Sequence, residues 1–283
     1  MELTLSIVGA GKVGRVLGRQ FHQHKIFTLQ EVLNRSLDSS RDACDFIGAG
    51  QPISTLSKLR QADVYMITVP DDQISDVGIQ LVENGLIQPS TVVFHCSGAL
   101  TGAALRSKSS LINHSASVHP LRSFADPTQV ANSFSGTICT IEGDVFSTKE
   151  LTHRLKQCGA QVVTIGSENK TLYHAAAVFA SNYLVTLVDA AIMTFKAAGI
   201  SPVMAKQMAA PLAQETLNNV FRLGSQKALT GPIARGDKHT VKQHEDALKK
   251  WDQEMAALYI ELAKSTTTMK DRSLDEPHDP GNA

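Results

Sequence analysis

The sequence predicts a chain of two domains, a doubly wound α/β domain with a mostly parallel sheet followed by an all-α domain. From Leu3 to Gly166, short β-branched runs alternate with helical or turn-rich segments, which is typical of a parallel sheet covered by helices. Beyond Glu168, long runs of Ala, Leu, Met and Lys recur at helical spacing. The length of 283 residues also fits two domains better than one or three.

Each element is expected from its own run of residues. The strands of the first domain are predicted at Leu3–Val8, Thr28–Leu33, Val64–Val69, Thr91–His95, Ala116–His119, Thr137–Ile141 and Gln161–Ile165. The helices of the second domain are predicted at Lys170–Ala198, Pro202–Leu223 and Thr240–Lys264. We assign residues 1–166 to the first domain, 167–265 to the second, and 266–283 to a disordered tail of mixed charge with almost no apolar residues.

The charge balance excludes partners that are held by a long-range electrostatic field. Lys plus Arg number 27 and Asp plus Glu number 27, while 42% of the residues are hydrophobic and 19% are charged. Such a composition is typical of a soluble globular protein, and not of a disordered or nucleic-acid-coating one. Any anion must be recognised at a local site, which favours a small-molecule partner.

Two further features bear on the compartment. The four cysteines form no C-x-x-C pair, and the N-terminus has the pattern of a strand and not of a cleavable signal, which favours the cytoplasm with reduced thiols. The most apolar segment, Leu172–Phe195, contains His174, Asn182 and Asp189. Because polar and charged groups are costly within a bilayer, we expect a helix buried in protein and no membrane span.

A glycine-rich turn follows the first predicted strand. Its sequence is Gly9-Ala10-Gly11-Lys12-Val13-Gly14. Gly9 would permit a tight turn, Gly11 would let a pyrophosphate approach the backbone, and Gly14 would let the following helix pack closely on the strand. Free N–H groups at the start of that helix would face the anion. The alternative is a tight structural turn that binds no ligand.

The end of the second predicted strand bears on the choice between NAD and NADP. The residues there are Asn34, Arg35 and Ser36, with no carboxylate. An Asp or Glu would bind the ribose hydroxyls of NAD and repel a 2′-phosphate, whereas Arg35 offers that phosphate a guanidinium and Asn34 and Ser36 add neutral donors. The pattern favours NADP over NAD, and it disfavours FAD and S-adenosylmethionine. The alternative for Arg35 is a solvated surface cation.

Several longer strings resemble a known family. They are IVGAGKVG at Ile7–Gly14, NRS at Asn34–Ser36, ITVPDDQI at Ile67–Ile74, HCSGAL at His95–Leu100, VHPLRSF at Val118–Phe124, YHAAAVFASNYL at Tyr173–Leu184 and GPIARGD at Gly231–Asp237. With the helical second half, they resemble the 6-phosphogluconate dehydrogenase-like superfamily. Within it they are similar to a subgroup of Rossmann-like proteins whose helical C-terminal domain has no assigned function, often labelled NADP oxidoreductases of the deazaflavin-dependent type.

The resemblance implies an N-terminal NAD(P)-binding Rossmann domain and places residues around its cofactor. It implies that Val69 and Pro70 line the ribose and pyrophosphate, although Pro70 is equally explained as a strand terminator. It also implies a small hydroxyl residue near the nicotinamide, here Ser97. The alternative for Ser97 is a hydroxyl that satisfies its own turn.

Two histidines are candidate proton donors. His119-Pro120 closes a predicted strand and resembles the His-Pro pair of prephenate dehydrogenase-like enzymes; the alternative is that His119 holds the following loop through backbone hydrogen bonds. On the long helix, 100° per residue places His174, Ser181, Asn182, Val185 and Asp189 on one stripe, which would face a cleft between domains. Hydroxyacid dehydrogenases of the superfamily carry a Lys one turn before an Asn here, and none precedes Asn182 at that spacing. His174 is either a proton donor or a satisfied core residue.

The segment Gly231–Asp237 is expected to be a shaped loop between two helices. Arg235 would clamp an anionic group of the substrate, or else pair with Asp237 or cap a helix end. In the same alternative, Asp237 caps the next helix near Thr240. No metal site is expected, because the remaining histidines lack metal-ligand spacing with a matching carboxylate set; these are His22, His24, His239, His244 and His278.

Together these features predict an NADP(H)-dependent oxidoreductase that transfers a hydride between nicotinamide and a small carbonyl, imine or hydroxy-acid-like compound. His174 or His119 would donate the proton, Asn182 and Ser97 would orient the acceptor, and Arg235 would hold an anionic group. The apolar content of the long helices predicts a homodimer, with no nucleic-acid or membrane partner. The alternative function is a non-catalytic NADP(H)-binding sensor or regulatory protein.

Overall fold

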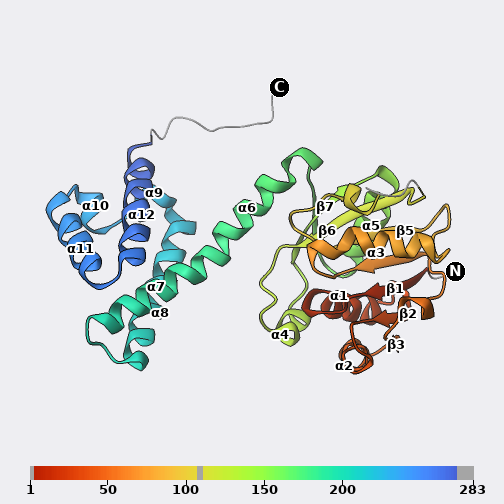
Figure 1. Ribbon diagram of the computed structural model, residues 1–283. Coiled ribbons are helices and arrows are strands. Elements are labelled where there is room, and N and C mark those ends of the chain that lie inside the picture. Colours follow the sequence, from red (N-terminus) through yellow and green to blue (C-terminus); the bar gives the residue numbers. More distant parts are fainter. Residues whose placement is uncertain (1–2, 107–110, 273–283) are drawn as a thin grey trace. The chain divides into compact units, whose positions relative to one another are not determined.

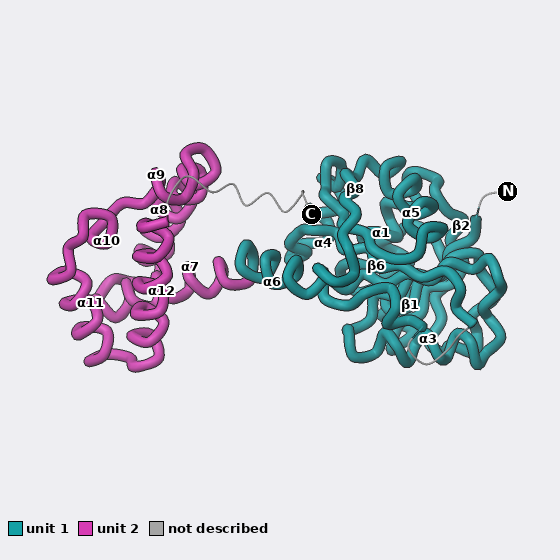
Figure 2. Tube along the Cα trace, turned by 90° about the horizontal axis from the view of Figure 1, so that it is seen from above, with its two compact units in different colours: residues 1–181 teal, residues 182–283 magenta. Residues whose placement is uncertain are grey.

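The computed structural model describes residues 3–106 and 111–272. The chain divides into two compact units, unit 1 (Met1–Ser181) and unit 2 (Asn182–Ala283), which Figure 2 colours separately. The division falls after the predicted boundary at Gly166, because helix α6 (Lys170–Ala180) begins on the strands of unit 1, where Lys170 and Tyr173 make hydrogen bonds.

Unit 1 is built on one sheet in the order β3-β2-β1-β4-β5-β6-β7-β8. Its strands are β1 (Thr4–Val8), β2 (Thr28–Leu33), β3 (Gln51–Ile53), β4 (Val64–Ile67), β5 (Val92–His95), β6 (His114–Pro120), β7 (Ile138–Gly143) and β8 (Gln161–Thr164). Every neighbouring pair is parallel except β6 and β7. The predicted fold class is therefore confirmed, and β3 is a short edge strand that the sequence reasoning missed.

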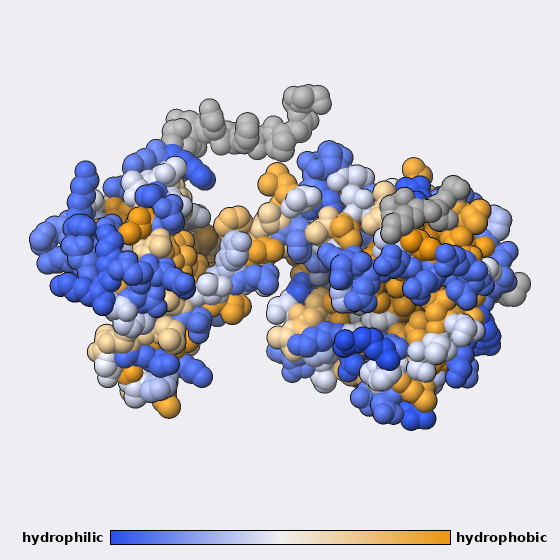
Figure 3. All heavy atoms as spheres, viewed as in Figure 1, coloured by the Kyte–Doolittle hydropathy of each residue, from blue (hydrophilic) through white to orange (hydrophobic). Residues whose placement is uncertain are grey.

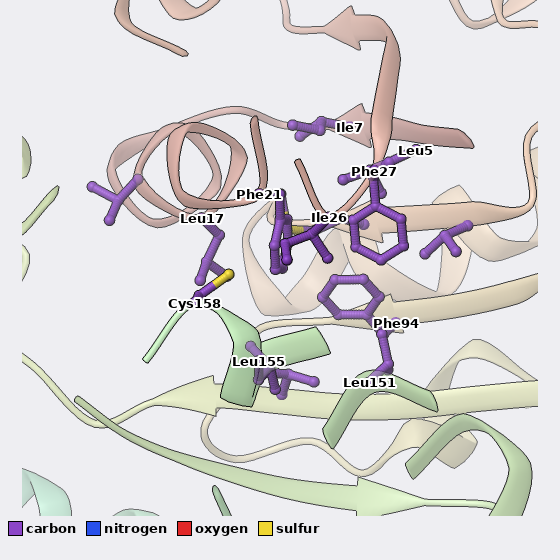
Figure 4. Packing of buried hydrophobic residues seen from close by; sticks show 14 of the residues in the cluster. Leu5, Ile7, Leu17, Phe21, Ile26, Phe27, Phe94, Leu151, Leu155 and Cys158 are labelled. Carbon is purple, nitrogen blue, oxygen red and sulfur yellow. The ribbon is translucent and has the colours of Figure 1, made fainter. Parts of the chain in front are cut away.

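Helices cover both faces of the sheet (Figure 1). They are α1 (Lys12–Gln23), α2 (Leu37–Ile47), α3 (Ile74–Glu83), α4 (Pro127–Asn132) and α5 (Val145–Gln157). Consecutive strand residues point to opposite faces, so Ile7 joins the apolar cluster under α1 and α5 while Val8 joins the cluster under α3. In the first cluster the rings of Phe21 and Phe27 meet edge to face at 5.1 Å, beside Phe94 (Figure 4).

Unit 2 is all-helical in its described part. Its helices are α7 (Asn182–Ala197), α8 (Pro202–Leu223), α9 (Ser225–Ala228), α10 (Gly231–Arg235), α11 (Lys238–Trp251) and α12 (Gln253–Asp271). Helix α12 continues six residues into the predicted tail, since its Thr-rich last turns still form hydrogen bonds to preceding carbonyls. The rest of that predicted tail, residues 273–283, lies outside the described residues.

Three predicted segments differ from the structure at their centres. The single helix expected at Lys170–Ala198 is broken at Ser181, whose φ of −124° and ψ of −68° are not helical. The helix expected at Thr240–Lys264 is broken at Asp252, which turns out of α11 and caps α12 by accepting a hydrogen bond from the backbone N–H of Met255. The loop expected at Gly231–Asp237 contains the one-turn helix α10.

The stretch Ser167–Ala197 is long and apolar enough to span a membrane by length and composition, with a mean hydropathy of 1.6 in a window of which none is buried. The expectation that this segment is buried in protein is therefore wrong for the single chain. Large apolar side chains stand open on α6, where Leu172 is 75% exposed, and they show as hydrophobic surface in Figure 3.

Candidate active site

The glycine turn after β1 is shaped by close packing. Gly9 has a φ of +86°, and a Cβ there would lie 2.6 Å from Cγ1 of Val69. Its N–H donates to the carbonyl of Leu33 at 2.7 Å, which joins the turn to the neighbouring strand β2. A Cβ on Gly14 would lie 2.2 Å from the hydroxyl oxygen of Thr68. Only glycine fits at both positions, as the motif predicts.

Gly11 differs from the other two glycines because a Cβ there would meet nothing within 4 Å. The space above Gly11 is therefore open to a ligand. No side chain caps the start of α1, and the first helical hydrogen bond runs from the N–H of Arg15 to the carbonyl of Gly11. The N–H groups of Lys12, Val13 and Gly14 are the unpaired donors at the N-terminus of this helix. These residues fit a pyrophosphate.

At the end of β2 the structure separates three predicted cofactor residues. The side-chain amide of Asn34 donates to the carbonyl of Ser39 at 2.8 Å, and Ser36 caps α2 by accepting from the N–H of Ser39. Arg35 is exposed and pairs with no described residue. Asn34 and Ser36 thus build the turn, and Arg35 is the side chain left for a ligand.

The one carboxylate of β2 lies inside the unit and away from the strand end. Glu31 is buried, accepts a hydrogen bond from the hydroxyl of Ser6 at 3.1 Å, and pairs with the guanidinium of Arg60. A residue in the middle of a strand cannot take the position of a ribose-binding acid at its carboxyl end. The absence of an acid beside Arg35 therefore holds in the folded unit.

Lys12, Val69 and Pro70 lie around the same turn. The ammonium of Lys12 donates to the carbonyl of Ala125 at 3.1 Å, so its side chain is tied to the loop after β6. Val69 packs against Gly9, and Pro70 is exposed where it precedes the short 3₁₀ helix η2 (Asp71–Gln73). Val69 supports the turn, while Pro70 is accessible at the carboxyl edge of the sheet.

Ser97 follows β5 and its hydroxyl is already used. The hydroxyl donates to Oδ2 of Asp71 at 2.8 Å and accepts from the N–H groups of Ala99 and Leu100 at 3.1 and 3.0 Å. Ser97 is also buried. The turn-satisfying alternative for Ser97 therefore describes its contacts, and it can orient a substrate only by giving up one of them.

His119 at the end of β6 meets the first turn of α6. Its Nδ1 lies 2.7 Å from the hydroxyl of Tyr173, and its ring stands edge to face with the rings of Tyr173 and His174, each at 5.7 Å. Gly98 lies beneath both histidines, since a Cβ there would come within 2.3 Å of Nδ1 of His174 and 3.0 Å of Cε1 of His119. His119 is thus held by a phenol, and not by the backbone of the loop that follows it.

Lys170 lies under this group and is only 1% exposed. Its ammonium donates to the hydroxyl of Ser117 at 2.7 Å, and that hydroxyl donates to the carbonyl of Ser97 at 3.0 Å. Lys170, Tyr173 and His174 are spaced i, i+3 and i+4, so they share one face of α6. That face brings an ammonium, a phenol and an imidazole onto the carboxyl ends of β5 and β6.

Burial sets the protonation of the group. It lowers the pKa of Lys170 to about 8, with Glu142, Cys96 and Asp71 acting in the opposite direction. Burial, followed by the positive charge of Lys170, lowers the pKa of His119 to about 4. Burial also raises the pKa of Tyr173. At neutral pH the site therefore holds a charged lysine, a neutral His119 and a protonated phenol.

His174 carries the clearest sign of a missing partner. Its Nδ1 is buried and has no hydrogen-bond partner among the described residues. An unpaired buried polar atom costs about 1–3 kcal/mol. Such a cost is often found at sites that a ligand completes. His174 is consistent with the predicted proton donor and not with a satisfied core histidine.

The two remaining predicted residues belong to unit 2. Asn182 is the first residue of α7, so it does not share an unbroken helix with His174 and the predicted single stripe is wrong. Arg235 is the last residue of α10. Asp237 caps α11 by accepting from the N–H of Thr240 at 3.0 Å, as the structural alternative for that loop predicts.

Four residues of the site were missed by sequence reasoning: Lys170, Tyr173, Asp71 and Ser117. A signal for two of them was present, because the i, i+3, i+4 spacing of Lys170, Tyr173 and His174 predicts a shared helix face. The resemblance implies a lysine one turn before Asn182, whereas Lys170 lies one turn before His174.

Comparisons with known proteins agree with this architecture. Residues 1–116 match the model of a Rossmann-like domain, and residues 137–266 match a domain of unknown function (DUF2520). No curated protein matches the sequence.

Solved structures share the fold at low identity. BF3122 from Bacteroides fragilis, a candidate NADP oxidoreductase, is 21% identical with a TM-score of 0.79, over 94% of this chain and 98% of its own. A Plasmodium falciparum pyrroline carboxylate reductase with NADP bound is 13% identical with a TM-score of 0.58, over 94% and 98%. A prephenate dehydrogenase from Aquifex aeolicus, in complex with hydroxyphenyl propionate and NAD+, is 15% identical with a TM-score of 0.57, over 95% and 99%. The chain thus combines a Rossmann-like domain with a C-terminal DUF2520 domain.

Proposed function

We propose that this protein is an NADP(H)-dependent oxidoreductase acting on a small carbonyl, imine or hydroxy-acid-like compound. The proposal rests on one observation, which is that the candidate residues gather at the carboxyl edge of the sheet. The open glycine turn after β1, Asp71 after β4, Ser97 after β5 and His119 at the end of β6 lie at the carboxyl ends of four strands that are neighbours in the sheet. Open α/β sheets bind ligands beyond that edge, at the point where the strand order reverses.

NADP is the cofactor that these residues fit best. The space above Gly11 and the unpaired N–H groups of α1 suit a pyrophosphate, and the unpaired guanidinium of Arg35 suits a 2′-phosphate. Structures of this fold are solved with NADP and with NAD+, so the fold by itself leaves the choice open. Our choice of NADP therefore rests on Arg35.

The cofactor, when bound, would supply the hydride that is added to the carbonyl or imine carbon. The oxygen or nitrogen of that group must then gain a proton, and His174 is the donor we propose, since its Nδ1 has no partner. Ser97 and Gly98 would form the floor below the acceptor.

Cofactor choice is tested by fluorescence titration with NADPH and NADH. Arg35→Ala should weaken NADPH binding at least tenfold, about the loss of one charge-assisted phosphate contact, and leave NADH binding within twofold. Arg41→Ala is the matched control, because Arg41 is an exposed arginine of α2 that pairs with Asp38. Equal loss in both variants, or tighter NADH binding by the wild type, would overturn the choice of NADP.

Turnover is tested by challenging bound NADPH with keto acids, imines and oxidised deazaflavin. Oxidation of NADPH by a member of the panel, lost in His174→Gln, is expected. Tight NADPH binding without oxidation by any member would reject the enzyme and favour the sensor.

We also propose that the protein is a homodimer whose exposed apolar helices are covered by a second copy. Large side chains that are open in the single chain support this, among them Leu172, Phe179, Val185, Leu212 and Phe221. Large exposed apolar patches are rare on soluble monomers and often mark protein–protein contacts. Sedimentation equilibrium should give twice the mass of the chain. A monomeric mass, or flotation with liposomes, would overturn the dimer.

A further inference from the structure

The contacts of His119 constrain where its proton sits. We propose that Tyr173 and Lys170 are positioning residues that keep His119 a neutral imidazole with its proton on Nε2, so that His119 donates a hydrogen bond to the substrate and does not supply the proton. The inference deepens the proposed function and rests on it for the substrate. Its evidence is the arrangement of α6 over the end of β6.

Tyr173 selects the tautomer. Its hydroxyl lies 2.7 Å from Nδ1 of His119, and burial, which raises the pKa of Tyr173, keeps that hydroxyl protonated. The hydroxyl of Thr140 also contacts the phenol, and it has no other partner among the described residues. If Nδ1 carried the proton, it would donate to the phenol oxygen, the phenol would donate to Thr140, and the proton of the buried Thr140 hydroxyl would have no acceptor. With Nδ1 as the acceptor, Thr140 donates to the phenol and the phenol donates to Nδ1, so all three groups are satisfied and the proton of the neutral ring must be on Nε2.

Lys170 keeps the ring neutral. Its ammonium is anchored on Ser117, two residues before His119 on the same face of β6, and lies 5.9 Å from the centre of the Tyr173 ring. A second positive charge on His119 would be repelled by this ammonium. The other charged or titratable groups that face His119 are His174 on α6, which also disfavours its protonation, and Asp71 on η2, which favours it. Asp71 is engaged by the hydroxyl of Ser97.

The free nitrogen of His119 remains available to a ligand. Nε2 has no partner among the described residues, and it is not one of the buried unpaired atoms, so it is accessible. A neutral Nε2–H donor stabilises negative charge that develops on a substrate oxygen without losing its own proton. The proton must then come from another group, which leaves His174 in that role. The two histidines would thus divide polarisation and proton donation between them.

Nitrogen-15 NMR of the ligand-free protein tests the inference without any turnover. The ten histidines can be labelled together, and the His119 signals identified by their loss in His119→Gln. We expect the wild type to show His119 with Nε2 protonated and Nδ1 accepting a hydrogen bond, unchanged from pH 8 to pH 5. Titration of His119 near 6.5, or a proton on Nδ1, would overturn the inference.

Two variants separate the two positioning roles. Tyr173→Phe should mix the tautomers of His119, and Lys170→Met should raise the pKa of His119 by about 1, the size expected for removal of a nearby like charge. The chain offers matched controls: Tyr259→Phe removes a similar phenol–imidazole hydrogen bond, 2.9 Å from Nδ1 of His244 in unit 2, and Lys149→Met removes an exposed lysine of α5. The controls should leave the His119 signals unchanged.

Activity provides a second and independent readout. Once a substrate is known, Tyr173→Phe should lower kcat about tenfold with KM within twofold, since the misplaced donor acts on developing charge. A wild type that turns over NADPH while His119 titrates near 6.5 would sink this inference and leave the proposed function standing. A wild type with the expected NMR signals but no NADPH binding would sink the proposed function and leave the tautomer assignment intact.

Discussion

The two units of the chain differ in how they bury apolar side chains. Unit 1 encloses two clusters of buried residues, one on each face of its sheet, with Phe94 and Tyr65 fully inaccessible. Among the described residues of unit 2, the buried ones are three alanines, Ala205, Ala209 and Ala256. Its large side chains form helix surfaces instead, and Phe221 is 85% exposed.

Because of this difference, the two units are expected to be stabilised in different ways. Unit 1 buries enough apolar surface to fold around its own core, at about 25 cal/mol for each Å² removed from water. Unit 2 leaves the same kind of side chain exposed on its helices. The sheet unit carries the candidate site, and the helical unit carries the apolar side chains that the proposed dimer would cover.

The largest expected effect contrasts two phenylalanines, one in each unit. Phe94→Ala should lower the free energy of unfolding of unit 1 by about 3–5 kcal/mol, because it leaves a cavity between sheet and helices. Phe221→Ala should leave the stability of the isolated chain nearly unchanged and instead weaken self-association. Chemical denaturation at several protein concentrations measures both. A concentration-independent loss for Phe221→Ala would show that the two units are stabilised in the same way.

The next effect contrasts two glycines. Alanine at Gly98 would drive a methyl group into the rings of His174 and His119, and a displacement of about 1 Å in a catalytic group lowers kcat/KM about 10²-fold. Gly199 in unit 2 has a φ of +88° but nothing within 4 Å, so Gly199→Ala should strain the backbone and lower Tm without lowering kcat/KM. Steady-state kinetics and thermal melts of both variants provide the check. Full activity in Gly98→Ala would remove both histidines from the reaction.

The two units also differ in how much of their secondary structure could be predicted from the sequence. Period-2 runs and the glycine turn place β2 at Thr28–Leu33 and the ligand turn at Gly9–Gly14, because strand pattern and turn chemistry are local. The breaks at Ser181 and Asp252 were not predicted, since both lie within continuous helical periodicity. The tertiary contacts of α6 with β6, made by Lys170 and Tyr173, are also not encoded in local spacing.

The contacts of a site residue were predicted only where that residue acts through its own turn. Gly9, Gly14 and Arg35 follow from strand ends, whereas Ser97 is engaged by Asp71, which precedes it by 26 residues. In the sequence, Lys170 is an ordinary lysine at the start of a helix. Only the structure shows that its ammonium donates a hydrogen bond to the hydroxyl of Ser117 at 2.7 Å. The residue types of the site were visible in the sequence. Their hydrogen-bond partners were not, because those partners lie far away along the chain.

The pH dependence of unfolding also distinguishes the two units, because the lysine and the histidine whose pKa values change strongly on folding both lie in unit 1. The pKa of Lys170 falls from 10.5 to about 8 and that of His119 from 6.5 to about 4 on folding. In each window the unfolded chain binds more protons than the folded one, so the free energy of unfolding rises with pH. Relative to the wild type, His119→Asn should lose this rise between pH 4 and 6.5, and Lys170→Met should lose it between pH 8 and 10.5.

Each change should amount to on the order of 3 kcal/mol across its window, since each pKa moves by roughly 2.5 and a change of one in pKa corresponds to about 1.4 kcal/mol. Urea denaturation at closely spaced pH values gives the slopes, with Lys149→Met as the exposed control. Parallel curves for wild type and Lys170→Met above pH 8 would mean that the ammonium is not buried in solution.

The smallest expected effect contrasts two helix caps. Asp144 caps α5 by accepting from the N–H of Ser147 at 3.0 Å, and its other oxygen accepts from the N–H of Ser115 on β6 at 2.7 Å. Asp237 caps α11 in unit 2 and bonds only the N–H and hydroxyl of Thr240.

Asp144→Ala should therefore destabilise unit 1 by about 2 kcal/mol, the upper end for a lost cap, since a strand N–H is left without an acceptor as well. Asp237→Ala should lower the free energy of unfolding by less, because Asp237 bonds only Thr240 and its loss leaves no strand N–H without an acceptor. Asn at either position should restore most of the loss, since its side-chain oxygen still accepts from the helix N–H. Equal losses in the two units would mean that the bond from Ser115 to Asp144 contributes nothing, and that the caps of both units act through their helices alone.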